Sequence, residues 1–461
     1  MKKSIVLAAM VVVGFWMTES RPLIGRSAAP SQATPTFNKE VIRILQNNCQ
    51  VCHRPGDIAP FSLMTYEETW PWAERIREVT ESRYMPPWKP ADGCGDFQFE
   101  RKLTQQEIDT LARWVEVGAP EGDPADLPPP LEFPDQWRLG QPNVVLELPT
   151  DFMPDPYGQD VYRCFSLPTP FTRDQWISAV DIQPGNRAIV HHVLLFVDRR
   201  GQSAALDEQD VGPGYSCFGG PGVEPANETE GVEFLLGAWA PGAQPLVAPD
   251  QVAFKVPAGA RIVIQMHYRP NGRPESDRTK VGLYFPTTPI KKQFRTLPIL
   301  NRNFTIPAGA ERHRVTATFR IPSFIDFHGW LIAPHMHLLG REIKVTAKPL
   351  NRPLQCLIHI KDWDFNWQDG YWFEKPVPLP RNTTITVEAY YDNSANNPLN
   401  PNSPPQPVSW GERTVDEMCL VFLGFTVDAE QLGPNGESNL SEDAKQFLKA
   451  IEEQSVFCRP Q

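Results

Sequence analysis

The sequence is poor in histidine, in basic charge and in long apolar runs. Only nine of its 461 residues are histidine, and 44 Lys and Arg are outnumbered by 55 Asp and Glu, giving a net charge of -11. This balance argues against nucleic acid or an anionic membrane surface as a partner. Glycine (30) is rarer than proline (49), and with 13 Trp and 25 Phe the composition favours proline-interrupted β-structure over long helices. A chain of this length predicts several domains rather than one core.

One long apolar run is present, from Ile5 to Met17, and two lysines precede it. Its length is typical of a secretory signal and short for a membrane span. We expect residues 1–29 to be a signal peptide, with a candidate cleavage point at Ser27–Ala29. An uncleaved anchor is the alternative, and it is the one membrane contact that the sequence suggests. Export predicts a periplasmic protein whose disulfides persist, which matters for its eight cysteines.

Cys49, Cys52 and His53 form a CxxCH motif. Two thiols at this spacing can add to the vinyl groups of haem, and the next histidine can then reach the iron. The alternatives are a chance CxxC and a zinc or redox pair. Export and the helical context favour a covalent c-type haem.

The residues around the motif predict helices at 37–48 and 65–82, and a third that begins after a capping box at Thr104. Three helices with CxxCH after the first resemble a class I cytochrome c domain, which we place at 34–120. The sixth haem ligand in such a domain is a methionine or a second histidine. No other histidine lies there, which leaves Met64 and Met85. We favour Met85, because the prolines after it would hold an extended loop, whereas Met64 suits packing.

A proline-rich linker is expected at 121–136, and beyond it short β-prone runs alternate with Pro and Gly turns. Examples are the runs at 176–182, 188–198, 261–268 and 383–391. This pattern predicts antiparallel sandwich or jelly-roll structure. The turn and strand at 256–264 are echoed at 379–387, which suggests two similar β-domains, at 137–288 and 289–430. A tail with a short helix would follow at 431–461.

Five of the eight histidines outside the helical region fall in three tight settings. They are His191 and His192 in VHHV, His267 in QMHY, and His335 and His337 in APHMHLLG. Residues i and i+2 of a strand share a face, so His335 and His337 could chelate one metal ion or form a hydrogen-bonded core pair. The isolated His313, His328 and His359 are interpreted as structural. Met418, in DEMC, would by itself be core packing.

Taken together, HH, QMHY, HMHLLG and DEMC resemble the type II copper, ascorbate-dependent monooxygenases, the family of peptidylglycine α-hydroxylating and dopamine β-monooxygenases. The resemblance covers roughly residues 140–430. It implies two jelly-roll domains that face each other across a cleft, each with one copper ion. His191, His192 and His267 would form the electron-transfer site, and His335, His337 and Met418 the oxygen-binding, catalytic site. Adjacent His191 and His192 would point to opposite faces of a regular strand, so one metal requires a bulge or a strand end there.

The resemblance also implies disulfides beside the ligand strands. Cys164 would pair with Cys217, and Cys419 would pair with Cys356. Cys94 and Cys458 are left over and could pair with each other. Gln265 and Tyr162 match positions near the electron-transfer site.

The chain departs from the peptide-amidating members of the family. Their substrate-binding Arg, Asn and Tyr are replaced by Ala333, Leu420 and Phe422, so a peptide C-terminus is not expected and the substrate is expected to be less polar. The haem motif suggests a periplasmic or respiratory electron donor in place of ascorbate. The sequence therefore predicts a monooxygenase with two copper ions and one haem that hydroxylates a C–H bond of a small organic substrate with O2. The alternatives are a non-catalytic haem and copper electron-transfer or copper-binding protein, and an oxidase without an organic substrate.

Overall fold

The computed structural model describes residues 34–133, 137–217, 220–223, 233–411 and 413–452. The expected signal peptide and Cys458 lie outside these residues. No helix within the described ranges is long and apolar enough to cross a membrane. Most of the regular structure is β-sheet, with a few short helices concentrated at the start of the chain.

The helical part, residues 34–133, begins the described chain. Its elements are η1 (Phe37–Val41), α1 (Ile42–Asn48), α2 (Tyr66–Thr69), η2 (Trp70–Trp72), α3 (Ala73–Glu81), α4 (Gln105–Glu116) and η3 (Pro124–Asp126). The helix expected at 65–82 is divided by a 3-10 turn that contains Pro71, which has no N–H to donate. The capping box at Thr104 is present, since the Thr104 side chain accepts from the N–H of Glu107. Leu111 and Trp114 on α4 are fully buried in the helical core.

The first β-sandwich follows the linker. Its elements are β1 (Val144–Glu147), β2 (Val161–Pro168), β3 (Gln175–Ile177), β4 (Ala179–Gln183), β5 (Val190–Asp198), α5 (Ser203–Gln209), β6 (Tyr215–Ser216), β7 (Glu233–Trp239), β8 (Leu246–Val247), β9 (Val252–Val256), β10 (Arg261–Tyr268) and β11 (Lys280–Tyr284). A five-stranded sheet in the order β6-β2-β10-β5-β7, here the β10 sheet, packs against the four-stranded sheet β1-β11-β4-β8. The short helix α5 was not expected from the sequence.

The second β-sandwich has the same two-layer plan. Its elements are β12 (Lys292–Gln293), β13 (Arg295–Asn301), β14 (Thr305–Ile306), β15 (His313–Arg320), β16 (Phe327–His335), β17 (Gly340–Lys348), β18 (Gln355–Ile360), β19 (Tyr371–Leu379), β20 (Thr384–Tyr391), β21 (Val408–Ser409) and β22 (Cys419–Val427), followed by α6 (Glu442–Glu452). The sheet β13-β22-β16-β19, here the β16 sheet, packs against β15-β20-β17-β18. Pairing is antiparallel as expected, except that β12 pairs in parallel with β9 of the first sandwich.

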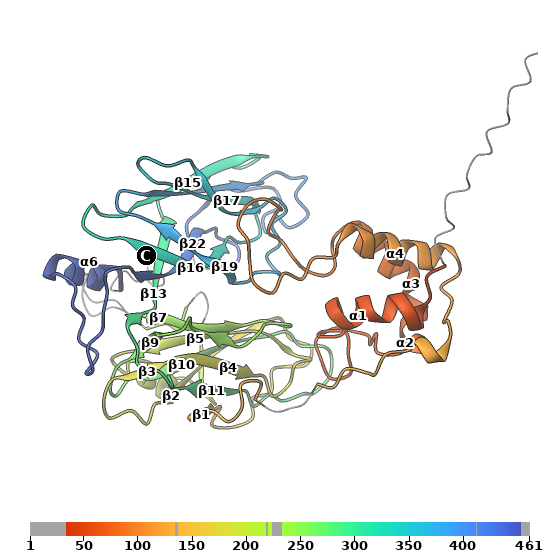
Figure 1. Cartoon of the computed structure of the whole chain (residues 1–461), viewed down its shortest axis with the longest axis horizontal. Coiled ribbons are helices and arrows are strands. Elements are labelled where there is room, and N and C mark those ends of the chain that lie inside the picture. The colour runs from red at the N-terminus through yellow and green to blue at the C-terminus, as the bar shows by residue number, and fades with distance from the viewer. Residues whose placement is uncertain (1–33, 134–136, 218–219, 224–232, 412, 453–461) are drawn as a thin grey trace, which may run out of the picture.

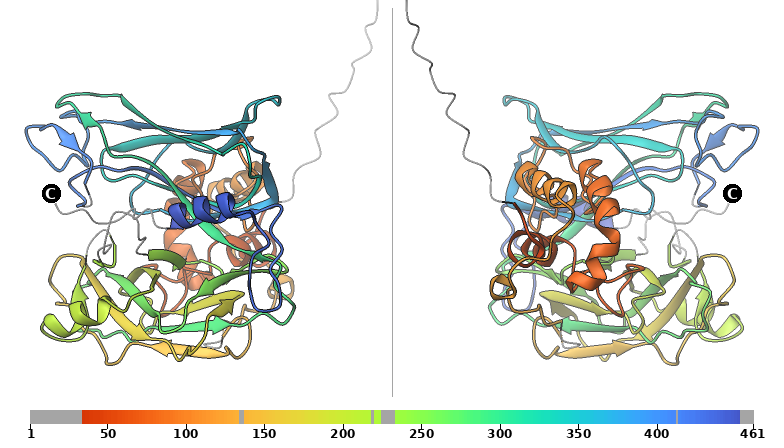
Figure 2. Two further views of the ribbon diagram at one scale, coloured as in Figure 1. Left: turned by 90° about the vertical axis from the view of Figure 1, so that its left-hand side faces the viewer. Right: turned by 90° about the vertical axis from the view of Figure 1, so that its right-hand side faces the viewer.

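The two sandwiches are stacked, and the helical part lies against one end of both (Figures 1 and 2). The rings of Phe294 and Trp372 are in contact, with centroids 5.5 Å apart. Phe294 is part of the core of the first sandwich, and Trp372 of the second sandwich packs against that core. A buried ion pair fixes the chain where the second sandwich begins, since Arg295 donates to both oxygens of Glu430 at 2.8 and 2.9 Å. The β10 sheet and the β16 sheet are the layers turned toward each other (Figure 1).

Two disulfides are present among the described residues. Cys164 is bonded to Cys217, as expected, with a Cα–Cα distance of 5.8 Å. The expected pairing of Cys356 with Cys419 is wrong, because Cys356 is bonded to Cys94 across 262 positions of sequence. Cys419 is a buried free thiol. The pairing of Cys94 with Cys458 is therefore also wrong, and the helical part is covalently joined to the second sandwich.

Candidate metal centres

Three histidines meet on the outer face of the β10 sheet, meaning the face turned away from the core of its own sandwich. Their ligand nitrogens all lie within 4.8 Å of one another, and within the described part of the chain no other group of three His, Cys, Asp or Glu side chains meets this criterion. The Nδ1 atom of His192 is 3.3 Å from Nδ1 of His191 and 3.3 Å from Nδ1 of His267. Nitrogens that bind one ion at about 2.0–2.1 Å lie roughly 3.3–3.6 Å apart at tetrahedral to trigonal angles, so the spacing fits a single metal.

A shift in strand register brings the adjacent pair to one face. His267 on β10 is opposite His192, but the next residue, Tyr268, is opposite Val190. His191 is therefore the extra residue of a bulge at the start of β5, which is the irregularity that a shared metal requires. Tyr268 points into the sandwich core and is fully buried, which sends His267 to the other face.

The carboxylate of Asp160 orients His267. The ring Nε2 donates to Asp160 Oδ2 at 2.9 Å, which leaves Nδ1 with a lone pair directed at the other two imidazoles. Tyr162 stacks on the same ring with centroids 4.2 Å apart and an interplanar angle of 10°. Burial lowers the pKa of His191 to about 4 and that of His192 well below its ordinary value. Neutral imidazole is the form that binds metal.

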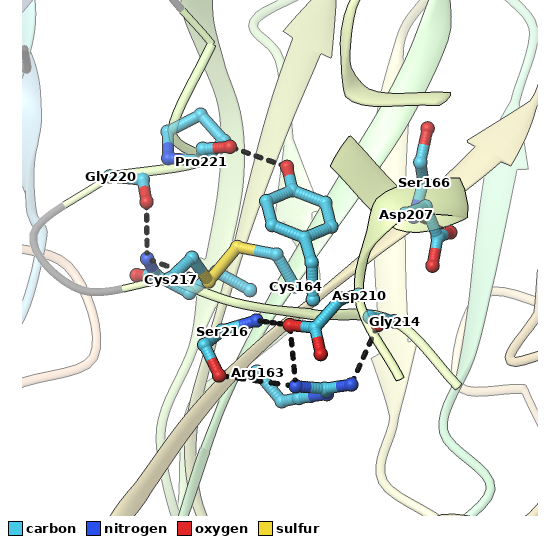
Figure 3. Close-up of a disulfide and its surroundings, with 12 residues drawn as sticks. Arg163, Cys164, Ser166, Asp207, Asp210, Gly214, Ser216, Cys217, Gly220 and Pro221 are labelled. Atoms are coloured by element: carbon cyan, nitrogen blue, oxygen red, sulfur yellow. Dashed lines mark hydrogen bonds and ion pairs between the residues drawn. A yellow bond between two sulfur atoms is a disulfide. The ribbon is translucent and has the colours of Figure 1, made fainter. Parts of the chain in front are cut away.

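The disulfide lies on the same face of the β10 sheet as His267. Cys164 on β2 is opposite Gln265 on β10, two residues before His267. Gln265 donates to the carbonyl of Gly220, and beside the disulfide Arg163 donates to Asp210, Ser216 and Gly214 (Figure 3). This network fixes the strands beneath the three histidines. Tyr162 contacts the cluster through His267, and Gln265 lies two positions before His267 on the same face of β10.

His335 and His337 form the second cluster, at the end of β16. Their Nε2 atoms are 3.1 Å apart. Each ring donates through Nδ1, His335 to Gln368 Oε1 at 2.5 Å and His337 to the carbonyl of Asp416 at 3.0 Å. The two lone pairs therefore converge, and burial lowers the pKa of His335 to about 3 and that of His337 to about 4.

Met418 is fully buried immediately before β22. His335 is opposite Leu420 in the sheet, so continuing the antiparallel register places Met418 beside His337. Its neighbour Glu417 accepts from the backbone N–H groups of His337 (2.9 Å), Leu339 (2.6 Å) and Met418 (3.2 Å). Burial raises the pKa of Glu417 to about 8. One carboxyl group therefore holds the HMHLLG turn and the methionine segment together.

The two clusters face each other. His335, Leu420 and Phe422 are on the outer face of the β16 sheet, because Val421, Leu423 and Phe425 on the alternate face form the sandwich core. Burial is the main cause of the lowered pKa of His192, and charges on His267, His191 and, across the two sheets, His335 lower it further. His328 and His359, which were interpreted as structural, lie outside both clusters and are paired with Asp428 and Glu342.

Sequence reasoning did not find Asp160, Gln368 or Glu417. Asp160 and Gln368 are in loops with no periodicity to mark them, and each acts only through the histidine that it touches. Glu417 gave no clear signal either, because it ends the mostly polar run GERTVDE, and only the residues after it are apolar. A carboxyl group at such a position is buried only when it has several partners.

No family model matches the chain. DBH-like monooxygenase protein 1 of Homo sapiens is 24% identical over 294 residues, which are 59% of this chain and 45% of that protein. Putative DBH-like monooxygenase protein 2 of Homo sapiens is 22% identical over 317 residues, 63% of this chain and 58% of that protein. The chain thus spans about half the length of these curated relatives. Its distant homologues include DBH-like monooxygenase proteins.

Similarity to solved structures is weak. The glycosylasparaginase PNGase F from Flavobacterium meningosepticum has a TM-score of 0.25 at 11% identity and covers 62% of this chain and 94% of its own. The major capsid protein P2 from bacteriophage PM2 has a TM-score of 0.23 at 10% identity and covers 64% of this chain and 100% of its own. Scores this low carry no argument about function.

Replacing Asp160 with alanine is expected to weaken metal binding at the three-histidine cluster by roughly 10- to 100-fold, the usual effect of losing a group that orients a ligand. Without the carboxylate, His267 is free to adopt the other tautomer, which buries its lone pair away from the metal. Copper(I) affinity would be measured by competition with a chromogenic chelator. Asp428→Ala is the matched control, because it removes an aspartate from a histidine outside both clusters. Equal losses in the two variants would contradict the role of Asp160.

Proposed function

We propose that this protein is a copper-dependent monooxygenase that hydroxylates a C–H bond of a small organic substrate with O2, with electrons supplied through a covalent c-type haem. The main support is the pair of partly buried histidine clusters on facing sheets, in each of which the ring nitrogens converge. The distant DBH-like monooxygenase relatives support the reaction class. The protein acts in the periplasm and receives electrons from a periplasmic or respiratory donor.

Copper fits both clusters by ligand chemistry. Imidazole suits copper in both oxidation states, and a thioether favours Cu(I), so His335, His337 and Met418 would hold the ion that meets O2. His191, His192 and His267 would hold the electron-transfer ion. When bound, copper supplies one-electron redox chemistry and the activation of O2. The chain supplies neutral, oriented ligands at both positions, and the balance of the reaction is one O2, two electrons and two protons consumed per hydroxylated C–H bond and water formed.

The surroundings of the CxxCH segment support the haem proposal over a redox-active pair. Cys49 and Cys52 are half-buried free thiols, and burial raises the pKa of Cys49 to about 12 and that of Cys52 to about 11. Redox-active cysteines have a lowered thiol pKa instead. His53 donates through Nδ1 to the carbonyl of Phe61 at 3.2 Å, which leaves Nε2 as the lone pair for iron. Met85, half-buried after α3, is the proposed sixth ligand.

The haem motif adjoins the first sandwich, which supports electron entry there. A Cβ at Gly242 would lie 3.4 Å from the Cys52 sulfur, and the φ of +82° at Gly242 also favours glycine. Three residues earlier, Trp239 at the end of β7 is paired with Val193 on β5, the residue after His192. One short turn and one strand pair therefore connect Cys52 to the three-histidine cluster.

The surroundings of the second cluster favour an apolar substrate. Met418 and Leu420 are packed with Leu300, Trp410 and Phe422 in a small apolar cluster separate from the sandwich core. Ala333 is opposite Phe422 in the sheet. These are the positions where the peptide-amidating enzymes would hold a carboxylate, and here they offer no charged group. The substrate therefore meets apolar side chains at these positions next to the oxygen-binding site, with the Arg302 guanidinium over the nearby Trp410 ring.

The test uses haem-loaded protein, chemically reduced and mixed with O2 with and without copper. Haem re-oxidation is followed by absorbance, and we expect copper to speed it. If copper makes no difference, the parts are not coupled as proposed and a non-catalytic binding role is favoured. If copper speeds re-oxidation but peroxide or water is the sole product with every apolar C–H substrate offered, the protein is an oxidase rather than a monooxygenase.

A further inference from the structure

A segment of the helical part brackets one loop of the second sandwich. The segment is residues 86–101, here the strap, and the loop is residues 361–370, between β18 and β19. Ala91 of the strap donates to the carbonyl of His359 at 2.8 Å, just before the loop. Gln98 donates to the carbonyl of Trp372 at 2.8 Å, just after it. The strap thus adds hydrogen bonds to both strands that carry the loop.

Covalent and apolar contacts hold the strap in place. Cys94 is bonded to Cys356 on β18. Phe97 is part of the core of the second sandwich and stacks on Phe373 of β19 with centroids 5.4 Å apart. Trp88 packs edge-on against Tyr371, the first residue after the loop, at 5.5 Å. The strap is therefore part of the second sandwich although it belongs to the helical part in sequence.

Arg101, at the end of the strap, contacts the loop directly. Its Nη2 is 2.8 Å from Asp369 Oδ2, and its Nη1 donates to the carbonyl of Pro241 in the first sandwich at 3.4 Å. Asp369 follows Gln368, whose amide nitrogen donates to the carbonyl of Phe365 at 2.9 Å. That bond leaves the amide oxygen of Gln368 to accept from His335 Nδ1.

We propose that Arg101 is a positioning residue for the second metal site, acting through Asp369 and Gln368 on the tautomer and orientation of His335. The identity of the metal rests on the proposed function, but the positioning role does not. The helical part is then a structural component of the oxygen-binding site as well as the carrier of the haem motif. Because the strap begins directly after Met85, the same segment joins the proposed haem ligand to the support of a copper ligand.

The first test uses Arg101→Gln, Arg101→Lys and Arg381→Gln in the full-length protein. Arg381→Gln is the matched control, because it removes an exposed ion pair with Asp326, at the opposite end of β16. Copper(I) affinity of each site is measured by chelator competition, and the sulfur ligand seen by X-ray absorption identifies the second site. We expect Arg101→Gln to weaken the second site about tenfold or more and to leave the first unchanged. Arg101→Lys should recover part of the loss, and Arg381→Gln should lose nothing.

The second test needs no metal. In metal-free protein with 15N-labelled histidine, the wild-type spectrum should show His335 protonated at Nδ1, and Arg101→Gln should show a mixture of tautomers. An unchanged His335 spectrum would overturn the positioning role. Equal loss of copper at both sites would also overturn it, because that result indicates general undocking of the helical part. If wild-type protein binds no copper but Arg101→Gln still changes the His335 tautomer, the proposed function is refuted while this inference is supported.

Discussion

Met418→Ala is expected to abolish the copper-dependent acceleration of haem re-oxidation by O2, returning the rate to that of copper-free protein. The thioether is the one soft ligand in the proposed oxygen-binding site, and its loss leaves two imidazoles that hold Cu(I) less firmly. Met418 is well placed for this role because its segment is held rigidly, with its carbonyl accepting from the Tyr391 hydroxyl at 2.7 Å. Rapid mixing of reduced, copper-loaded protein with O2 measures the effect.

Met153→Ala is the control for this experiment, since Met153 is 57% exposed and distant in sequence from every proposed ligand. It should keep the full acceleration. Copper content must be measured in parallel, and Met418→Ala should still bind one ion at the three-histidine cluster. If Met418→Ala retains the acceleration with that ion alone, O2 reacts at the first cluster and the assignment of the two sites is wrong.

The arrangement of the histidines was largely predictable from sequence because strand geometry is strict. His335 and His337, two positions apart, were expected to share a face of a strand, and they lie together although β16 ends at His335. Adjacent His191 and His192 could share one only through a bulge, and the register shift opposite Tyr268 provides it. The strand at β10 was equally clear from sequence. Its core-facing residues Ile264, Met266 and Tyr268 alternate with Gln265 and His267.

The residues that hydrogen-bond to these histidines could not be predicted, because they are in loops that come together only after folding. Asp160 and Gln368 are examples, and neither belongs to a pattern. The error in the cysteine pairing has the same cause. The resemblance implied that Cys419, next to Met418, would pair with Cys356. The strap instead places Cys94 beside Cys356, from which it is separated by 262 positions of sequence. Nothing in a local reading of residues 86–101 indicates that they pair with β18 and β19.

Replacing both Cys49 and Cys52 with alanine is expected to remove covalent haem completely while leaving both copper sites intact. Each cysteine sulfur forms one thioether bond to the haem, so both must be replaced to remove covalent attachment. A single replacement should leave one thioether bond and a shifted haem absorbance band. Haem staining after denaturing electrophoresis measures covalent attachment. Cys419→Ala is the matched control, since Cys419 is the third free cysteine of the described chain and lies in the core of the second sandwich.

The double variant also separates the two roles assigned to the helical part. The strap contacts the second sandwich through Cys94, Phe97 and Arg101, none of which depends on haem. The double variant should therefore bind copper at both sites with wild-type affinity, yet reduce it only when a soluble reductant is added. Retention of covalent haem would refute the CxxCH assignment. Loss of haem together with loss of copper at the second site would mean that the haem itself, and not only the strap, holds the helical part against the sandwich.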